Sequence, residues 1–224
     1  MKFRSVFMTL SCAFALAACG GQDGSASVQA GSAAAEVPAG SVKVQTAHGE
    51  AVVPQNPERV AVYDLGAVDT LSKLGVKIGA SVDAQRLAYL DAPLKDAVKA
   101  GTLFEPNYEA LNAYNPQLIV IGSRMAKDKV SDELAKLAPT IDMTAQTDNM
   151  KESAKARIDA YGRIFGKQAE ADALKAEIDK TFADAKAAAQ GKGKGLVILV
   201  NAGKLSAFGP DSRLGGWIHR DIGV

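Results

Sequence analysis

The chain of 224 residues is long enough for one large domain or two small lobes, and its 47% hydrophobic and 23% charged residues are ordinary for a soluble globular protein. The formal net charge of +1 gives no reason to expect nucleic acid among its partners, because nucleic-acid-binding proteins usually carry a basic face. Both cysteines, Cys12 and Cys19, lie near the start, so the rest of the chain has no disulfide and must be stable through packing alone.

Residues 1–18 are typical of a secretory signal. Lys2 and Arg4 precede an apolar run that is too short for a comfortable membrane span. The run ends in Leu-Ala-Ala-Cys-Gly, which resembles the lipobox of bacterial lipoproteins. This resemblance implies that the signal is cut before Cys19 and that lipid is attached to this cysteine. The alternative is an ordinary signal peptide with a chance cysteine.

A flexible tether is predicted at residues 19–40, which are rich in Gly, Ser and Ala and show no periodicity. Several acyl chains on one protein give durable anchoring to a membrane. We therefore expect a globular body in the periplasm or cell envelope, held to a membrane by its lipid anchor.

Residues 41–149 are predicted to form an N-terminal α/β lobe. Segment 41–54 alternates around a His-Gly pair and indicates a β-hairpin. Beyond it, apolar strands at 60–63 and 117–121 alternate with helical segments, which is typical of a parallel sheet covered on both faces. Ligands of such sheets bind outside the carboxyl ends of the strands, and the Gly-Ser-Arg sequence at 122–124 lies at such an end.

Residues 150–190 lack proline, are rich in alanine and carry apolar residues at helical spacing. We predict a bridging helix here, either one long helix or two abutting helices broken near Gly162 or Gly166, and longer than the ~10–14 residues usual in globular proteins. Such a helix between two α/β parts indicates a rigid strut. Residues 191–224 follow with an apolar strand and a hairpin-like turn, and are predicted to form a partial C-terminal α/β lobe.

No enzyme signature is present in the sequence. There is no Gly-x-Ser-x-Gly elbow, and loop serines such as Ser206 and Ser212 have no identifiable catalytic partner. The two histidines, His48 and His219, do not have the spacing of a metal site, and a surface or capping role is expected, with iron ligation by His219 as the less favoured alternative. We therefore expect no catalytic residues, no metal site and no cofactor.

Two arginines occupy matching loops. Arg124 ends the sequence IGSR and Arg213 ends the sequence FGPDSR, and each follows a strand and a turn rich in small residues. Arginines on the two lips of a cleft would bind an anion through charge and forked hydrogen bonds. The alternative for each is a surface arginine in a salt bridge.

Four stretches together resemble the class III periplasmic solute-binding proteins of iron-siderophore ABC transporters, and most of all the branch that binds catecholate siderophores such as enterobactin. They are VYDLGAVDTLSKLGV, NPQLIVIGSR, the long helical segment and LSAFGPDSRLGGWIHRDIGV. The resemblance runs from about Val42 to the last residue. It implies two Rossmann-like lobes with parallel sheets, joined by a long helix, and a ligand in the shallow cleft between them.

The same resemblance implies a function. A member of this family is a monomer and not an enzyme; it captures a ferric siderophore and passes it to an ABC permease in the cytoplasmic membrane, so that iron is its cargo and not its cofactor. Arg124 and Arg213 match the ligand-binding arginines of the two lobes. A tris-catecholate ferric complex is an aromatic trianion, on which arginines can also stack.

The family pattern continues beyond the last residue of this chain, where it supplies a third arginine and, in some members, a His and a Tyr that ligate iron. We therefore expect a truncated sequence, an incomplete second lobe and poorly covered edges on the apolar strand at 196–200. Two alternatives remain beside a ferric-siderophore binder. One is a binder of haem, cobalamin or another metal chelate, and the other, of a different class, is a membrane-anchored α/β hydrolase.

Overall fold

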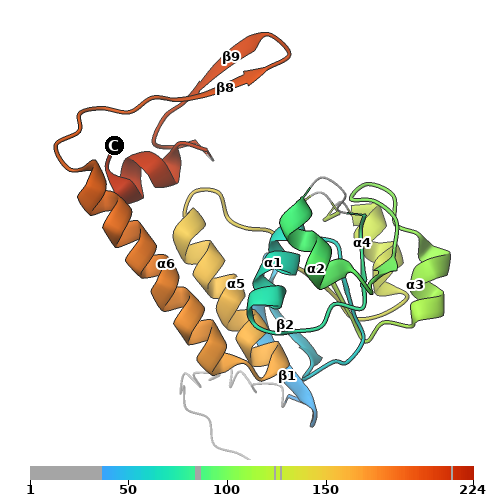
Figure 1. Cartoon of the computed structure of the whole chain (residues 1–224). Coiled ribbons are helices and arrows are strands. Elements are labelled where there is room, and N and C mark those ends of the chain that lie inside the picture. Colours follow the sequence, from blue (N-terminus) through green and yellow to red (C-terminus); the bar gives the residue numbers. More distant parts are fainter. Residues whose placement is uncertain (1–36, 84–86, 124, 127, 213) are drawn as a thin grey trace, which may run out of the picture. The chain divides into compact units, whose positions relative to one another are not determined.

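A five-stranded parallel sheet forms the first half of the fold (Figure 1). Its strands are β3 (Val60–Val62), β4 (Ala80–Ser81), β5 (Val98–Lys99), β6 (Leu118–Ile121) and β7 (Thr140–Asp142), in the order β5-β4-β3-β6-β7. Every neighbouring pair runs parallel, with Val62 opposite Val120 on β3 and β6. The predicted α/β fold with a parallel sheet is confirmed.

The computed structural model describes residues 37–83, 87–123, 125–126, 128–212 and 214–224. The predicted signal and most of the predicted tether lie outside these residues, as do Cys19, Arg124 and Arg213. None of the helices within the described ranges is long and apolar enough to cross a membrane.

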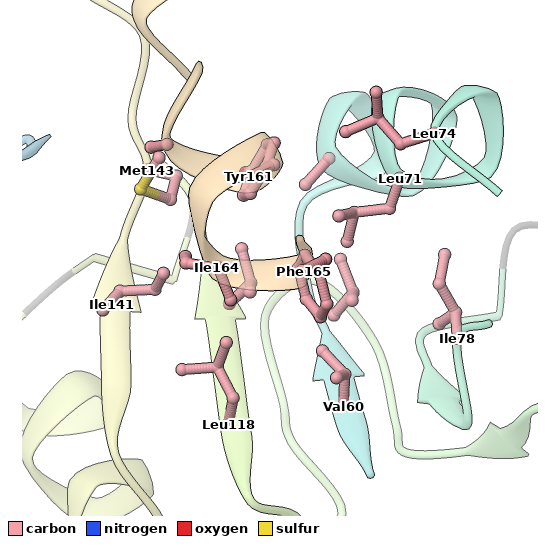
Figure 2. Packing of buried hydrophobic residues seen from close by; sticks show 14 of the residues in the cluster. Val60, Leu71, Leu74, Ile78, Leu118, Ile141, Met143, Tyr161, Ile164 and Phe165 are labelled. Carbon is pink, nitrogen blue, oxygen red and sulfur yellow. The ribbon is translucent and has the colours of Figure 1, made fainter. Parts of the chain in front are cut away.

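Helices cover both faces of the sheet. They are α1 (Leu65–Lys73), the 3-10 turn η1 (Ala88–Leu90), α2 (Asp91–Leu94), α3 (Tyr108–Tyr114), α4 (Asp128–Ala135) and α5 (Met150–Phe165). Successive strand residues point to opposite faces. Val60 and Leu118 therefore pack with α1 and α5 on one face, as Figure 2 shows, while Ala61 and Ile119 pack with α3 and α4 on the other. The predicted cover on both faces is confirmed.

A β-hairpin precedes the sheet, as predicted. Its strands β1 (Ser41–Thr46) and β2 (Gly49–Pro54) pair antiparallel, with Val44 and Val53 buried in the same core as α1 and α5. Gly49 has a φ of +101°, a conformation that residues with a side chain rarely adopt, and it closes the two-residue turn.

The segment 150–190 folds into two helices, α5 and α6 (Gln168–Ala189). Gly166 ends α5 with a φ of +63°, the left-handed conformation that glycine adopts without strain at a helix end. Of the two predicted alternatives, the structure shows the two abutting helices, with the break near Gly166. The apolar residues Ile158, Tyr161 and Ile164 of α5 are buried against the sheet, so α5 is part of that core. The first half of α6 joins the same core through Ala171.

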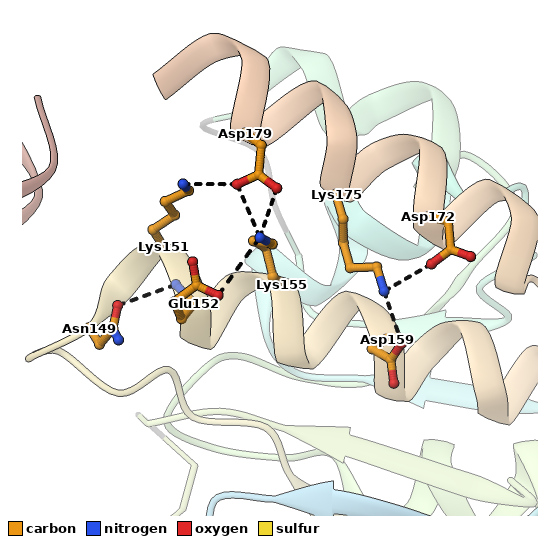
Figure 3. A network of polar contacts seen from close by, with 8 residues as sticks. All are labelled: Asn149, Lys151, Glu152, Lys155, Asp159, Asp172, Lys175 and Asp179. Atoms are coloured by element: carbon orange, nitrogen blue, oxygen red, sulfur yellow. Dashed lines mark hydrogen bonds and ion pairs between the residues drawn. The ribbon is translucent and has the colours of Figure 1, made fainter. Parts of the chain in front are cut away.

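Ion pairs hold α5 and α6 side by side (Figure 3). Lys151 and Lys155 both contact Asp179 at 2.8 Å, and Lys175 contacts Asp159 at 3.0 Å. Because the earlier residues of α5 pair with the later part of α6, the two helices run antiparallel.

The chain after α6 forms a second hairpin, made of β8 (Val197–Asn201) and β9 (Lys204–Phe208), followed by the helical turn η2 (Trp217–Ile222) against α6. Within the described residues after 190, β8 and β9 pair only with each other, so the expected second parallel sheet is not formed there. Leu205 is 74% exposed and Val200 66% exposed. The expected poor cover of this apolar strand is confirmed, whereas the division of the chain into lobes stays a prediction.

Candidate functional site

A hollow of about 250 Å³ lies at the carboxyl ends of β3 and β6, where the sequence predicts a ligand site. Its lining residues are Tyr63, Asp64, Leu65, Gly66, Leu103, Gly122 and Ser123. Residues 63–66 follow β3 and residues 122–123 follow β6, and parallel pairing of the two strands brings both loops to one edge of the sheet. The predicted Gly122 and Ser123 are thus at the site, and Arg124 is the next residue along the chain, outside the described ranges.

Asp64 begins helix α1 and borders the hollow. Its Oδ1 oxygen accepts a hydrogen bond of 2.7 Å from the main-chain N–H of Ala67, which caps the helix. The same oxygen accepts a hydrogen bond of 3.1 Å from the Nη2 of Arg157, on α5. The carboxylate is therefore held from two directions by the helix and by a cation.

Two glycines allow this carboxylate to lie close to the backbone of the hollow. A Cβ on Gly122 would lie 2.0 Å from the Oδ2 oxygen of Asp64, and a Cβ on Gly66 would lie 3.0 Å from Oδ1. No side chain larger than hydrogen fits at Gly122 without moving the carboxylate. The loop after β6 therefore needs glycine at position 122 to leave room for the Asp64 carboxylate.

Arg157 lies in a polar but mostly buried environment. Burial works against its charge, but its neighbours, the carboxylate of Asp64 among them, outweigh that effect and raise the pKa of the guanidinium. Burial also raises the pKa of the Tyr161 hydroxyl, which keeps this residue neutral. The pair of Arg157 and Asp64 therefore puts one positive and one negative charge under the edge of the hollow.

Tyr63 connects the hollow to the end of β5, which is separated from β3 by β4. Its hydroxyl donates a hydrogen bond of 2.6 Å to the main-chain carbonyl of Ala100, which follows β5. Burial, with a smaller contribution from Tyr108, raises the pKa of this hydroxyl. The loop that follows contributes Leu103 to the lining, and the adjacent Phe104 is 66% exposed.

A second hollow of about 370 Å³ lies farther along the same edge, at the ends of β4 and β5. Polar groups there include the Ser81 hydroxyl, which donates to the carbonyl of Val62 at 2.7 Å, and Asp83, which lies 3.8 Å from Lys99. The carboxyl edge of the sheet therefore offers polar groups on both sides of β3.

The histidines do not form a metal site. No group of three or more His, Cys, Asp or Glu side chains suited to a metal occurs in the described part of the chain. His48, in the β1–β2 turn, is 76% exposed and lies 2.9 Å from the buried Asp142. One ring nitrogen of His219 lies 3.1 Å from the carbonyl of Phe208, so this residue ties η2 to the β8–β9 hairpin.

Sequence reasoning found the edge of the sheet but missed Asp64 and Arg157. Asp64 carried a signal, because it directly follows an apolar strand, as the loop at 122–124 does. Arg157 had none, because it is one of many charged residues on a helix and its role depends on contact with a distant part of the chain. The predicted sites Cys19, Arg124 and Arg213 all lie outside the described residues.

Comparison with known proteins connects this architecture to a family. Residues 60–224 match the sequence model of the family described as periplasmic binding protein. The chain is similar to the petrobactin-binding protein YclQ of Bacillus subtilis, with 38% identity over 227 residues that cover 100% of this chain and 69% of YclQ. It is also similar to the ferric-anguibactin-binding protein FatB of Vibrio anguillarum, with 33% identity over 183 residues, 79% of this chain and 56% of FatB.

Solved structures agree in fold. The crystal structure of YclQ has a TM-score of 0.75 and 36% identity, and the match covers 82% of this chain and 66% of that chain. The periplasmic catecholate-siderophore binding protein VctP of Vibrio cholerae has a TM-score of 0.73 and 30% identity, with the same coverage of 82% and 66%. The chain thus spans between 56% and 69% of the length of these relatives.

Proposed function

Because this chain belongs to the periplasmic binding protein family, we propose that it is a solute-binding protein that captures a ferric siderophore and delivers it to an ABC permease for iron uptake. The observation that carries the proposal is the match of the whole chain to a petrobactin-binding protein, combined with a polar hollow at the carboxyl edge of the sheet. The relatives are named as binding proteins, which supports a role without catalysis.

The proposed ligand class is a catecholate-type ferric complex, of which enterobactin gives one example. Such a complex is anionic and aromatic, and guanidinium groups suit both properties through forked hydrogen bonds and stacking. Arg124 is proposed as the anion-binding residue beside Ser123, and Arg213 as its counterpart after β9. The similar protein VctP is described as a catecholate-siderophore binding protein, which supports this ligand class.

The proposed location is the periplasm, with lipid on Cys19 as the membrane anchor. The sequence before Cys19 supports this, because charged residues, an apolar run and small residues precede the thiol in the order that a lipoprotein signal needs. Metabolic labelling with a radioactive fatty acid tests the anchor: label should appear in the wild-type protein and be lost in Cys19→Ala, while Cys12→Ala keeps it.

Fluorescence of the single tryptophan, Trp217, tests the ligand assignment. Titration of the full chain with a ferric catecholate should quench Trp217 saturably, and Arg124→Ala and Arg213→Ala should each weaken binding about tenfold or more, because each removes a charge-assisted contact. Arg163→Ala, an exposed arginine on α5, is the matched control and should bind like the wild type. Absence of binding by protein that unfolds cooperatively would contradict the proposal.

A further inference from the structure

The hollow carries one carboxylate, which is unexpected in a site proposed for an anion. Among the described residues that line it, Asp64 is the only acidic one and the others are uncharged. This negative charge disfavours an anionic ligand, and Arg157, which contacts Oδ1 but does not line the hollow, offsets it only in part.

Arg157 contacts one of the two carboxylate oxygens of Asp64. Both hydrogen bonds that Asp64 accepts within the described part of the chain, from Ala67 and from Arg157, go to Oδ1. The Oδ2 oxygen has no hydrogen-bond partner among those residues. The side chain of Asp64 is 19% exposed, so this carboxylate is not sealed in the core.

Two glycines of the described part of the chain lie beside the carboxylate oxygens. Oδ2 packs against Gly122, and Gly66 lies over Oδ1. Both glycines line the hollow together with Asp64. An oxygen that is desolvated on one side and open on the other gains most from a hydrogen bond with a charged or strongly polar donor.

We propose that Oδ2 of Asp64 accepts a hydrogen bond from an N–H donor, an ammonium or amide group, on the arm of the bound ferric siderophore. Asp64 is then a specificity-determining residue: it favours chelates that carry such a donor and disfavours anionic chelates that lack it. This inference rests on the proposed function and adds the chemical class of the ligand's arm.

A purely structural role for Asp64 makes a different prediction. If the carboxylate only caps α1 and pairs with Arg157, its replacement alters all ligands alike through the shape of the hollow. If it contacts a donor on the ligand, its replacement has opposite effects on ligands with and without that donor. The comparison of two ligands therefore separates the two roles.

The experiment measures retention of iron by the full chain in equilibrium dialysis under nitrogen. The probes are the ferric complexes of 4-(2-aminoethyl)catechol and 4-propylcatechol, which share metal, ligating oxygens and arm length and differ in the ammonium group. The variant is Asp64→Asn, because asparagine caps a helix as well as aspartate and keeps the side-chain shape. Asp69→Asn, on the same helix but outside this hollow, is the control for the change in net charge.

We expect Asp64→Asn to weaken binding of the aminoethyl complex about tenfold or more, because a charge-assisted hydrogen bond is lost. Binding of the propyl complex should stay equal or become tighter, because the variant removes a repulsive charge. Asp69→Asn should leave both complexes within about twofold of the wild type. Asp64→Ser, which also caps helices well, should repeat the pattern if Asp64→Asn is poorly folded.

Equal changes with both complexes, or no change with either, would overturn the inference while leaving the proposed function intact. Failure of the wild-type protein to retain either complex would instead contradict the proposed function, and the inference would fall with it. The two failures are therefore distinguishable in one series of measurements.

Discussion

The Nη2 atom of Arg157 lies 3.1 Å from the Oδ1 oxygen of Asp64, and this contact joins residues 93 positions apart in the chain. Both side chains are mostly buried, at 18% and 19% exposure. The contact links α5 to the first turn of α1 at the edge of the hollow. Packing of α5 on the sheet and the shape of the candidate site therefore depend on the same ion pair.

Removal of the cation should destabilise the fold. Arg157→Ala leaves the mostly buried Asp64 without its partner, and we expect the free energy of unfolding to fall by about 1–3 kcal/mol, less than for a fully buried pair because water reaches this one in part. Urea unfolding measures the loss. Lys136→Ala breaks the exposed pair with Glu133 and should leave the free energy of unfolding almost unchanged. Equal losses in the two variants would contradict this account.

Acid should weaken the contact between α5 and α6. Hydrogen bonds from Lys151 and Lys155 hold the pKa of Asp179 below its usual value of 3.8. Because the folded state has the lower pKa, the stabilisation is complete above the ordinary value and is lost as the pH falls below 3.8 through the depressed value.

Urea midpoints of the wild type and of Asp179→Asn, measured from pH 7 to pH 2, test this prediction. The wild type should be the more stable protein at pH 7, and the difference should shrink below pH 3.8. High salt should also reduce the difference at pH 7, since the residues involved are solvent-accessible. A difference that stays constant across the whole pH range would show that the charge of Asp179 has no part in it.

A methyl group at Gly122 should disturb the site directly. The added Cβ of Gly122→Ala would lie 2.0 Å from Oδ2 of Asp64, so the carboxylate or the loop must move. We expect a loss of about 1–3 kcal/mol in stability, the usual range for overpacking, together with weaker ligand binding. Gly209→Ala is the control, because nothing lies within 4 Å of the Cβ it would add. If Gly122→Ala is as stable as the wild type, the loop after β6 accommodates the methyl group and the prediction is wrong.

The exposed strands of the second hairpin should promote self-association. Val200 and Leu205 face solvent, and β8 and β9 each leave one edge unpaired within the described residues. The double variant with Val200→Lys and Leu205→Lys should scatter less light at high protein concentration, because charged residues block edge pairing. Val52→Lys, an exposed valine on the first hairpin, should leave scattering unchanged. Equal scattering by all three proteins would exclude this hairpin as the cause.

The central strands could be predicted from the sequence because a parallel strand buried on both faces must be apolar along its whole length, as β6 is from Leu118 to Ile121. The break at Gly166 was one of two predicted positions, and the choice between Gly162 and Gly166 depended on tertiary contact. Gly162 is helical and lies against Ala171, where a Cβ would be 2.7 Å from that residue's methyl group. Gly162 lacks a side chain so that α5 and α6 can pack closely, whereas Gly166 is glycine because it ends α5 in a left-handed conformation.

The pairing at the candidate site could not be predicted in the same way. An aspartate after a strand and an arginine on a helix are both common, and neither residue indicates the other across 93 positions. For β8 the apolar run alone suits either a parallel or an antiparallel neighbour, but the hairpin-like turn predicted after it indicated the antiparallel pairing with β9 that the structure shows.

The close approach of Gly162 and Ala171 fixes the start of α6 against α5. At 1.5 Å per residue, its 22 residues extend about 33 Å from the turn at Gly166. A tilt of about 5° at that turn moves the far end of the helix by about 3 Å, because displacement grows with length. A substitution that adds a single methyl group at this crossing would therefore strain the ion pairs of Asp159 and Asp179, which hold α6 against α5, before it moves the far end of the helix.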